Sequence, residues 1–324
     1  MKSIFHNAIL TKFTMEGPWN RSWNFKLERK IIGFDHCRKL LNGAIYDKNG
    51  HLIHESIRKG GIFGDQVISI APIIVDPNTE TFESIEGNSA YLGNLYSHYG
   101  HFITEGLSRF YNFKELNKFD HILFNPYIFD YPNTQLQSFH KFFFDELGLD
   151  SSKIKILSNS ARLERVTVFK QLWTINDSVD PEISKLYEYL RFLDPKITIS
   201  EGRFFCSRKS SDRISNSRKI EELFSTMDFE VIFPEDLSLE KQLAIYKGDN
   251  LIVSTSGSTV HNILFGREGS RFVEIGDKRT PKSPHIMQQL ANSLSVANYQ
   301  FLPFHSDDNE NWNLAELEKL VKAL

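Results

Sequence analysis

Cysteine is scarce in this sequence, with Cys37 and Cys206 the two among 324 residues. Two cysteines are too few for a disulfide framework, which fits a reducing compartment. The sequence also lacks any apolar run that approaches the roughly 18 residues of a membrane-spanning helix. Polar side chains interrupt its first residues before the apolar core of a signal peptide can form. We therefore expect a cytoplasmic protein.

An excess of positive charge is missing as well. The formal net charge is −3, which argues against wholesale nucleic-acid binding, because such binding relies on cations that neutralise phosphates. Any bound phosphate must instead meet a local basic cluster. The 27 phenylalanines leave room for an exposed apolar patch, so peripheral contact with the inner face of the cytoplasmic membrane stays open.

Several cofactor motifs are absent too. The sequence contains no G-x-G-x-x-G, which disfavours dinucleotide binding, and no P-loop. It also contains no Asp-x-Asp, the usual means of holding a divalent ion against a sugar nucleotide in the single-domain transferase fold. We accordingly expect no metal and no other cofactor.

The pattern of the chain differs between its halves. The first half is β-rich, with a hairpin predicted over 44–53, where Asn49-Gly50 would supply both positive-φ positions of a type I′ turn. A strand is predicted over 68–75 and a helical stretch over 97–116. In the second half, helices predicted over 217–227, 238–246 and 258–265 alternate with strands predicted over 203–207, 229–233, 251–254 and 272–275. This alternation indicates an α/β fold with a parallel sheet covered on both faces.

Three features of the second half follow the predicted strands. A basic loop with Arg208, Lys209 and Arg213 follows the first strand, a small-residue turn over 254–259 follows the third, and Glu274 ends the fourth. Ligands of doubly wound sheets bind beyond the carboxyl ends of the strands. The turn would bring backbone N–H groups to phosphate oxygens, the cations would bind the same phosphates, and Glu274 would accept from ribose hydroxyls.

Each feature alone has an ordinary explanation: a helix cap, a solvated face or a surface carboxylate. Their position on one edge of one sheet favours a nucleotide diphosphate instead. The turn is not a nucleophile elbow, because Ser254 stands where the first Gly of G-x-S-x-G should be. The sequence therefore predicts a protein that handles an activated sugar.

An ordered set of motifs in residues 90–276 resembles the catalytic-domain pattern of glycosyltransferase family 61. That family includes bacterial capsule-type transferases and eukaryotic xylosyl- and N-acetylglucosaminyltransferases. The set comprises residues 94–105, Ser207-Arg208 with Arg213 and Asn216, residues 233–242, residues 254–265, and Val273-Glu274.

The resemblance implies a GT-B fold of two Rossmann-like domains, with a β-rich N-terminal part and an interdomain cleft. It implies an acceptor-binding domain over 1–180 that carries the base, a nucleotide-sugar-binding domain over 200–300, and inversion at the anomeric carbon. A final helix in 310–324, opened by the capping box Asn313-x-x-Glu316, would pack back on the N-terminal domain.

The expected donor-binding residues combine the basic loop, the turn and the last strand. The family usually has His-Gly-Ala-Gly in the turn, and Ser256 here replaces that His, which puts one donor contact in question. The full set is Arg208, Lys209, Arg213, Asn216, Ser256, Gly257, Ser258, Thr259, His261, Asn262 and Glu274.

Inverting transfer needs a base that takes the proton of the attacking hydroxyl. The family has a segment in which His, an aromatic residue and two further residues precede Asp; His101 and Glu105 carry over, with Glu in place of Asp. His98 matches no motif position, but it shares one helix face with the other two. We expect His101 or Glu105 to be the base and the other to orient it by an i, i+4 hydrogen bond.

Two other functions use the same residues. His98, His101 and Glu105 could hold a metal and make the protein a metal-dependent hydrolase, although their spacing departs from H-E-x-x-H. A non-catalytic subunit that binds a sugar nucleotide or glycan is also compatible with the loss of the turn His. The same residues also have an ordinary structural explanation. His98 and His101 would pack against neighbouring side chains or cap a helix, and Glu105 would be a solvated carboxylate.

The sequence thus predicts an inverting, metal-independent glycosyltransferase. It would move a sugar from a nucleotide-sugar donor, with a UDP-sugar expected first, to a hydroxyl of a glycan or lipid-linked acceptor. The resemblance implies a role in surface polysaccharide biosynthesis: capsule, lipopolysaccharide or exopolysaccharide.

Overall fold

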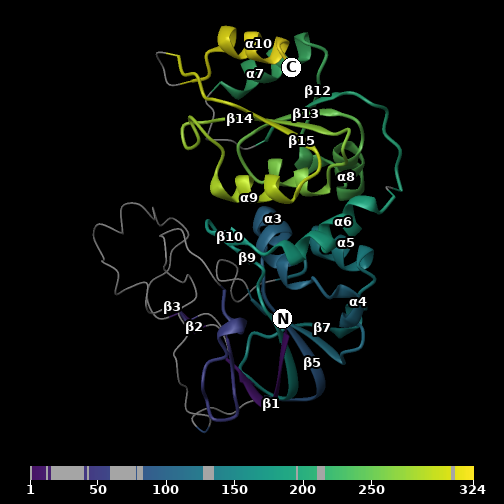
Figure 1. Cartoon of the computed structure of the whole chain (residues 1–324), viewed down its shortest axis with the longest axis vertical. Helices are drawn as coiled ribbons and strands as arrows, with labels where there is room; N and C mark the ends of the chain where they lie inside the picture. Colours follow the sequence, from purple (N-terminus) through teal and green to yellow (C-terminus); the bar gives the residue numbers. More distant parts are fainter. Residues whose placement is uncertain are drawn as a thin grey trace, which may run out of the picture. The chain divides into compact units, whose positions relative to one another are not determined.

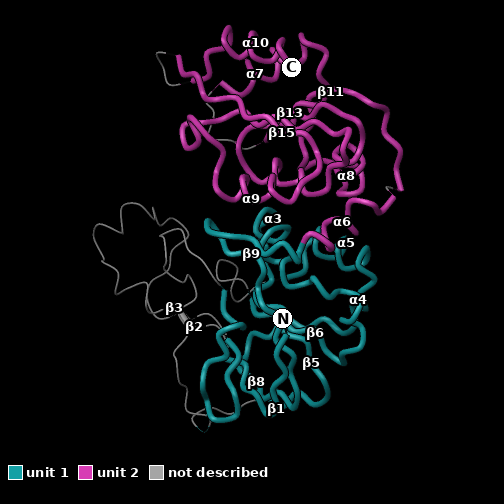
Figure 2. Tube along the Cα trace, viewed as in Figure 1, with its two compact units in different colours: residues 1–183 teal, residues 184–324 magenta. Residues whose placement is uncertain are grey.

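The computed structural model describes residues 2–11, 14–15, 40–41, 44–58, 78, 83–126, 135–194, 196–209, 216–307 and 311–324. The chain forms two compact units, residues 1–183 and 184–324 (Figure 2). Each unit combines a mainly parallel sheet with helices, so the predicted α/β class is confirmed. The strand predicted over 68–75 lies outside the described residues. No described helix is both long and apolar enough to cross a membrane.

Unit 1 is built on a six-stranded sheet. In spatial order its strands are β4 (Ile45–Tyr46), β1 (Lys2–Leu10), β8 (Ala161–Phe169), β5 (Glu83–Leu95), β6 (His121–Pro126) and β7 (Ile154–Ile156). Strands β8, β5, β6 and β7 pair in parallel, whereas β1 runs antiparallel to β4 and β8. Two short antiparallel pairs add β2 (Thr14–Met15) with β3 (Leu40–Leu41) and β9 (Trp173–Thr174) with β10 (Ser178–Val179).

Strand β5 is long and carries two irregularities, each marked by a glycine. Its register shifts between Ile85 and Asn88 and again between Tyr91 and Asn94. Gly87 and Gly93 lie within these shifts with φ of +82° and +78°, a conformation that glycine adopts without steric cost. The bulges bend the strand just before the segment that carries the candidate base.

The predicted hairpin over 44–53 forms, but its turn differs from type I′. Tyr46 forms a bridge with Leu52, and Gly50 has a positive φ, whereas Asn49 does not. The Asp47 carboxylate accepts hydrogen bonds from the backbone N–H groups of Asn49 and His51. This side-chain-to-backbone bonding replaces the second left-handed residue. The chain then enters the short 3₁₀-helix η1 (His54–Ser56).

The predicted helical stretch over 97–116 is helical but not one α-helix. It consists of α3 (Tyr99–His101), the π-helix η2 (Phe102–Gly106), the 3₁₀-helix η3 (Leu107–Arg109) and, after a turn, α4 (Phe113–Leu116). The hydroxyls of Thr104 and Ser108 donate to the carbonyls of Gly100 and Glu105. Such bonds compete with the helix ladder, and single π-turns of this kind are frequent at functional sites.

Helix α5 (Ser138–Glu146) follows in the chain, and phenylalanines gather beside it. Aromatic rings from η2, β6, α5 and the residue after η3 contact one another, namely Phe102, Phe124, Phe143, Phe144 and Phe110. The remaining short helices of unit 1 are η4 (Ser151–Lys153) and η5 (Pro181–Ile183). Most of the described phenylalanines are therefore inside, and Phe192 in unit 2 is the one counted among the exposed large hydrophobic residues.

Unit 2 contains a five-stranded parallel sheet. The spatial order is β12 (Glu230–Ile232), β11 (Arg203–Cys206), β13 (Leu251–Thr255), β14 (Arg271–Ile275) and β15 (Asn298–Leu302). Strand order therefore reverses between β11 and β13, which is the topological switch point of a doubly wound sheet. The first four of these strands in chain order lie where the sequence predicts them.

Helices cover both faces of this sheet (Figure 1). One face carries α7 (Ser217–Thr226) and α10 (Leu314–Lys322), and the other carries α8 (Leu239–Lys247) and α9 (Ile286–Leu294). The short η6 (Pro234–Asp236) precedes α8. On the second face η7 (Val260–Phe265) contacts α8, α9 and α6 (Ser184–Phe192). Ser238 and Asn313 cap α8 and α10 through their side chains, and the sequence predicts the Asn313 cap.

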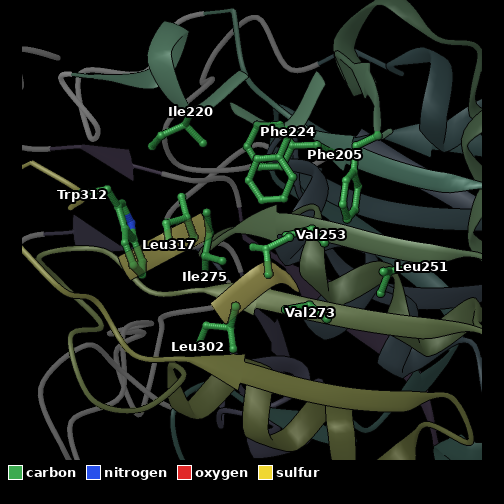
Figure 3. Packing of buried hydrophobic residues seen from close by; sticks show 12 residues of the cluster. Phe205, Ile220, Phe224, Leu251, Val253, Val273, Ile275, Leu302, Trp312 and Leu317 are labelled. Atoms are coloured by element: carbon green, nitrogen blue, oxygen red, sulfur yellow. The ribbon is translucent and has the colours of Figure 1, made fainter. Parts of the chain in front are cut away.

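The core on the first face joins the sheet to α7 and α10 (Figure 3). Phe205 and Phe224 stack with their ring centroids 4.0 Å apart. Leu317 and Val321 of α10 and the neighbouring Trp312 are fully buried in the same cluster. The apolar face of the last helix therefore packs in unit 2, and its packing against the N-terminal domain stays a prediction.

Candidate functional site

Glu105 is a buried carboxylate of unit 1. Glu105 is 1% exposed and Arg58 is 5% exposed. Arg58 donates two hydrogen bonds to the Glu105 carboxylate, from Nε to Oε2 at 2.7 Å and from Nη2 to Oε1 at 2.8 Å. Burial alone would raise the pKa of Glu105, but the Arg58 charge and the hydrogen bonds from His101 and Arg58 lower it to about 2. Glu105 is therefore ionised at neutral pH, and it is a weak base.

His101 completes the group. Its Nδ1 lies 2.6 Å from Oε1 of Glu105, and its side chain remains 29% exposed. An ionised carboxylate can only accept hydrogen bonds, so Nδ1 must carry the proton of the neutral ring and Nε2 keeps its lone pair. The arrangement makes His101 the group that can take a proton and Glu105 the group that orients it.

Aromatic rings enclose the pair. The Tyr96 ring stacks on His101 with a centroid distance of 6.1 Å, and the Arg58 guanidinium carbon lies 5.2 Å from the centre of the same ring. His98 is exposed and contacts the His101 ring edge-on at 5.1 Å. The three predicted residues His98, His101 and Glu105 thus lie together, and Arg58 is the partner that sequence reasoning missed.

The geometry does not favour the metal-site alternative. Both Glu105 oxygens are already bonded by a guanidinium, which a cation would have to displace. Within the described ranges, no group of three His, Cys, Asp or Glu side chains is arranged to hold a metal ion.

Unit 2 brings its predicted loop and turn together at the switch point. Cys206 of β11 and Ser254 of β13 are register partners, so the residues that follow them lie at one edge. Gly257 has φ +155°, and a Cβ there would collide with Nη2 of Arg208. Arg208 therefore lies directly over the turn, and Gly257 is needed for that approach.

Arg208 is partly buried, yet its guanidinium has no hydrogen-bonded partner among the residues whose positions the structure gives. Burial lowers its pKa from the ordinary value, and the nearby Arg279 charge acts in the same direction, against Glu235 and Asp277. An arginine remains charged under these conditions. Such a group over a turn of small residues is suited to an anion.

Arg279 is the second functional candidate that sequence reasoning missed. It pairs with Asp277, and its Nη2 donates to the carbonyl of Ser256 at 3.2 Å. The pKa of Asp277 is lowered, because the bonds and charge of Arg279 outweigh the effect of burial. A signal was present in the sequence, since Asp277-Lys278-Arg279 follows β14 as the basic loop follows β11.

Ser256 and Glu274 face inward. Ser256 Oγ donates to Glu274 Oε1 at 2.5 Å and contacts Thr280 Oγ1 at 2.7 Å, while the Tyr299 hydroxyl bonds the other Glu274 oxygen. Burial raises the pKa of Glu274, although both hydrogen bonds oppose the shift. Because Glu274 is 1% exposed and both oxygens are bonded, its geometry suits holding the turn better than holding a ribose.

The other predicted donor residues are placed differently. Lys209 pairs with Asp236 at 2.6 Å, and Asn216 donates to the Trp312 carbonyl at 2.9 Å. Asn262 is buried and bonds the Thr259 carbonyl, and His261 contacts Gln288. Ser258 and Thr259 lie in the partly exposed turn, and Arg213 lies outside the described residues.

The helix that follows this turn is also shorter than predicted. It is the six-residue 3₁₀-helix η7 rather than an α-helix. The contribution of a helix dipole is correspondingly small, so backbone N–H groups and the two arginines would have to supply the attraction for an anion.

Comparison with family models identifies the protein family of this chain. The family model described as Glycosyltransferase 61 matches residues 99–273, which is more than half of the chain. The chain belongs to Glycosyltransferase 61. This confirms the predicted family and makes the protein a glycosyltransferase with a sugar donor and an acceptor. A search of curated proteins finds no match.

The Glycosyltransferase 61 match contains His101, Glu105, Arg208 and the turn, but it ends before Glu274. Arg58 and Arg279 also lie outside it. Arg58 enters the candidate site through three-dimensional contacts alone, whereas Arg279 belongs to a second basic segment that follows a strand.

Proposed function

We propose that this member of Glycosyltransferase 61 inverts the anomeric carbon of a nucleotide sugar, with His101 as the base. The observation that carries the proposal is the bond between ionised Glu105 and His101 Nδ1, which leaves Nε2 to accept a proton. The acceptor hydroxyl attacks the anomeric carbon, its proton passes to Nε2, and the bond to the phosphate breaks with the nucleotide leaving as the anion. Glu105 orients the ring and stabilises the imidazolium that forms.

Unit 2 is proposed to bind the donor. Arg208 lies over Gly257, and Arg279 donates to the carbonyl of the neighbouring Ser256. These two cations support a diphosphate at the switch point between β11 and β13. Two guanidinium groups and backbone N–H groups can stabilise the charge of the leaving group without a metal. Unit 1 would bind the hydroxyl acceptor, and the units together would form the GT-B arrangement that the family resemblance implies.

The wider role follows from the resemblance. We propose a UDP-sugar as the first donor to test, a glycan or lipid-linked acceptor, and action in surface polysaccharide assembly inside the cell, at the cytoplasmic face of the membrane. The exposed Phe192 is a candidate for peripheral membrane contact.

Thermal melting with UDP, GDP, CDP and CMP, each with and without EDTA, tests the donor site. A ligand at 100 times its dissociation constant adds about 2.7 kcal/mol, which corresponds to a rise of several degrees. We expect one nucleotide to raise the melting temperature with EDTA present, and Arg208→Met to abolish the rise. No rise with any nucleotide would contradict the donor site, and a rise that EDTA removes would contradict metal independence.

A non-catalytic subunit remains the second candidate, because Ser256 replaces the family His and is turned toward Glu274. Binding of a nucleotide without transfer or hydrolysis of any nucleotide sugar would favour it.

A further inference from the structure

A second buried arginine, Arg109, contacts the backbone that leads to Arg58. Arg109, on η3, is 3% exposed. Among the described residues it forms no ion pair and donates instead to backbone carbonyls. Nη1 bonds the carbonyl of Glu55 at 2.9 Å and that of Phe169, and Nη2 bonds the carbonyls of Ser56 at 3.3 Å and Ile57 at 3.0 Å. Three of these four carbonyls belong to the consecutive residues immediately before Arg58.

The fold makes room for this arrangement. Gly93, at the second bulge of β5, has a positive φ, and a Cβ there would lie 2.6 Å from Nε of Arg109. A side chain at this position would push the guanidinium off the carbonyls. The bulge and Arg109 therefore fix the path of the 55–57 backbone, which ends at Arg58.

The position of the Arg58 backbone matters because Arg58 forms a bidentate ion pair with Glu105. A bidentate guanidinium–carboxylate pair depends on both distance and plane, and the two residues are 47 positions apart in the chain. Oε1 of Glu105 contacts both Nη2 of Arg58 and Nδ1 of His101, so rotation of the Glu105 carboxylate would change the hydrogen bond to His101. Tyr96 lies against the Arg58 guanidinium and the His101 ring.

We propose that Arg109 and Arg58 are positioning residues that act in series: Arg109 fixes the backbone before Arg58, Arg58 fixes the plane of Glu105, and Glu105 fixes the tautomer and direction of His101. The series rests on the proposed function of His101 only for its effect on turnover. Neither arginine needs to touch substrate.

Lysine substitutions separate geometry from charge, because lysine keeps the positive charge but lacks the planar fork. The test compares Arg58→Lys and Arg109→Lys with Arg191→Lys in the full chain. Arg191 is a matched control in unit 2: it is 5% exposed and also donates to two backbone carbonyls, those of Leu264 and Leu294. If Arg109→Lys does not fold, Arg109→Gln keeps two N–H donors and takes its place.

The first measurement is the ¹⁵N spectrum of the histidine rings, with the His101 signals assigned by their loss in His101→Ala. We expect wild-type His101 to have its proton on Nδ1, and Arg58→Lys and Arg109→Lys to show a mixture of tautomers, while Arg191→Lys matches wild type. Unchanged His101 signals in both variants would overturn the proposal. This measurement needs no turnover, so it stands even if the proposed reaction is wrong.

The second measurement is steady-state transfer. Misplacement of a catalytic group by about 1 Å can cost about 100-fold in rate. We expect kcat to fall about 100-fold in Arg58→Lys and about 10-fold in Arg109→Lys, with the KM for the donor unchanged. In Arg58→Lys combined with His101→Ala, the loss should equal that of His101→Ala alone, because residues that act as a unit are not additive. Additive losses, or a raised donor KM with normal kcat, would show that the arginines act elsewhere.

Discussion

Arg58 and Arg109 of unit 1 differ from Arg208 of unit 2 in what their N–H groups contact. In unit 1, Arg58 and Arg109 are almost fully buried and bonded to a carboxylate or to carbonyls. In unit 2, Arg208 is partly exposed over Gly257 and has no hydrogen bond to a described residue. A guanidinium that is hydrogen-bonded to protein atoms positions those atoms. A guanidinium at a sheet edge without such bonds to described residues is suited to bind an anion. This difference supports the proposal that unit 1 carries the base and that unit 2 binds the donor.

Loss of the proposed base should give the largest effect. His101→Ala is expected to lower kcat by about 10²–10⁴-fold, because no other group would take the proton, and to leave nucleotide affinity unchanged. His51→Ala is the control, since His51 lies in the exposed turn of the same unit with a side chain 60% exposed. Steady-state transfer assays check both, and equal losses in the two variants would remove the special role of His101.

Breaking the buried pair should give the next largest effect, on stability. Arg58→Met leaves Glu105 buried without its cation, which is expected to cost about 3–5 kcal/mol of unfolding free energy. Lys209→Met breaks an ion pair whose side chains are 59% and 48% exposed, and it should cost at most about 1 kcal/mol. Denaturant unfolding measures the two, and similar values would mean that Arg58–Glu105 is not a buried pair.

Acid should weaken the same interaction within a defined window. The pKa of Glu105 is about 2 in the folded protein against an ordinary 4.5, so its ionised form stabilises the fold above pH 4.5. This contribution, on the order of 3 kcal/mol, is lost as pH falls from 4.5 toward 2.

Unfolding of wild type and Glu105→Gln from pH 7 to pH 2.5 tests this expectation. The two proteins should differ most above pH 4.5 and approach each other below it. Glu268→Gln is the control at an exposed position. A difference independent of pH would show that Glu105 is not held ionised.

The smallest expected effect concerns the approach of Arg208 to the turn. Gly257 and Gly148 both have positive φ, but a Cβ at Gly148 would meet nothing within 4 Å. Alanine at either position should cost about 1–2 kcal/mol of stability through the backbone. Only Gly257→Ala should also weaken nucleotide binding, because it displaces Arg208; titration calorimetry would show whether Gly148→Ala does the same.

The sequence predicts the fold of unit 2 better than that of unit 1, for physical reasons. Strands buried on both faces, such as Leu251–Thr255, are short apolar runs between amphipathic helices, so local pattern and fold agree. Strand β5 contains Gly87, Gly93 and several polar residues, and its bulges break the alternation that marks a strand. The π-turn of η2 depends on tertiary packing and hydroxyl bonds rather than on periodicity.

In the candidate site, contacts between residues close in sequence could be predicted, and contacts between distant residues could not. His101 and Glu105 are neighbours on one turn, so spacing predicts their contact. Arg58 lies 47 residues from Glu105, and no local rule joins them. The inward turn of Ser256 and Glu274 likewise depends on Tyr299 and Thr280, residues outside every motif considered.

One measurement tests the division of labour between the units most directly: nucleotide-induced melting shifts and sugar transfer, measured side by side for His101→Ala and Arg208→Met. The account predicts that His101→Ala keeps the wild-type shift and loses transfer, and that Arg208→Met loses the shift. Wild-type transfer by His101→Ala, or a wild-type shift in Arg208→Met, would contradict it.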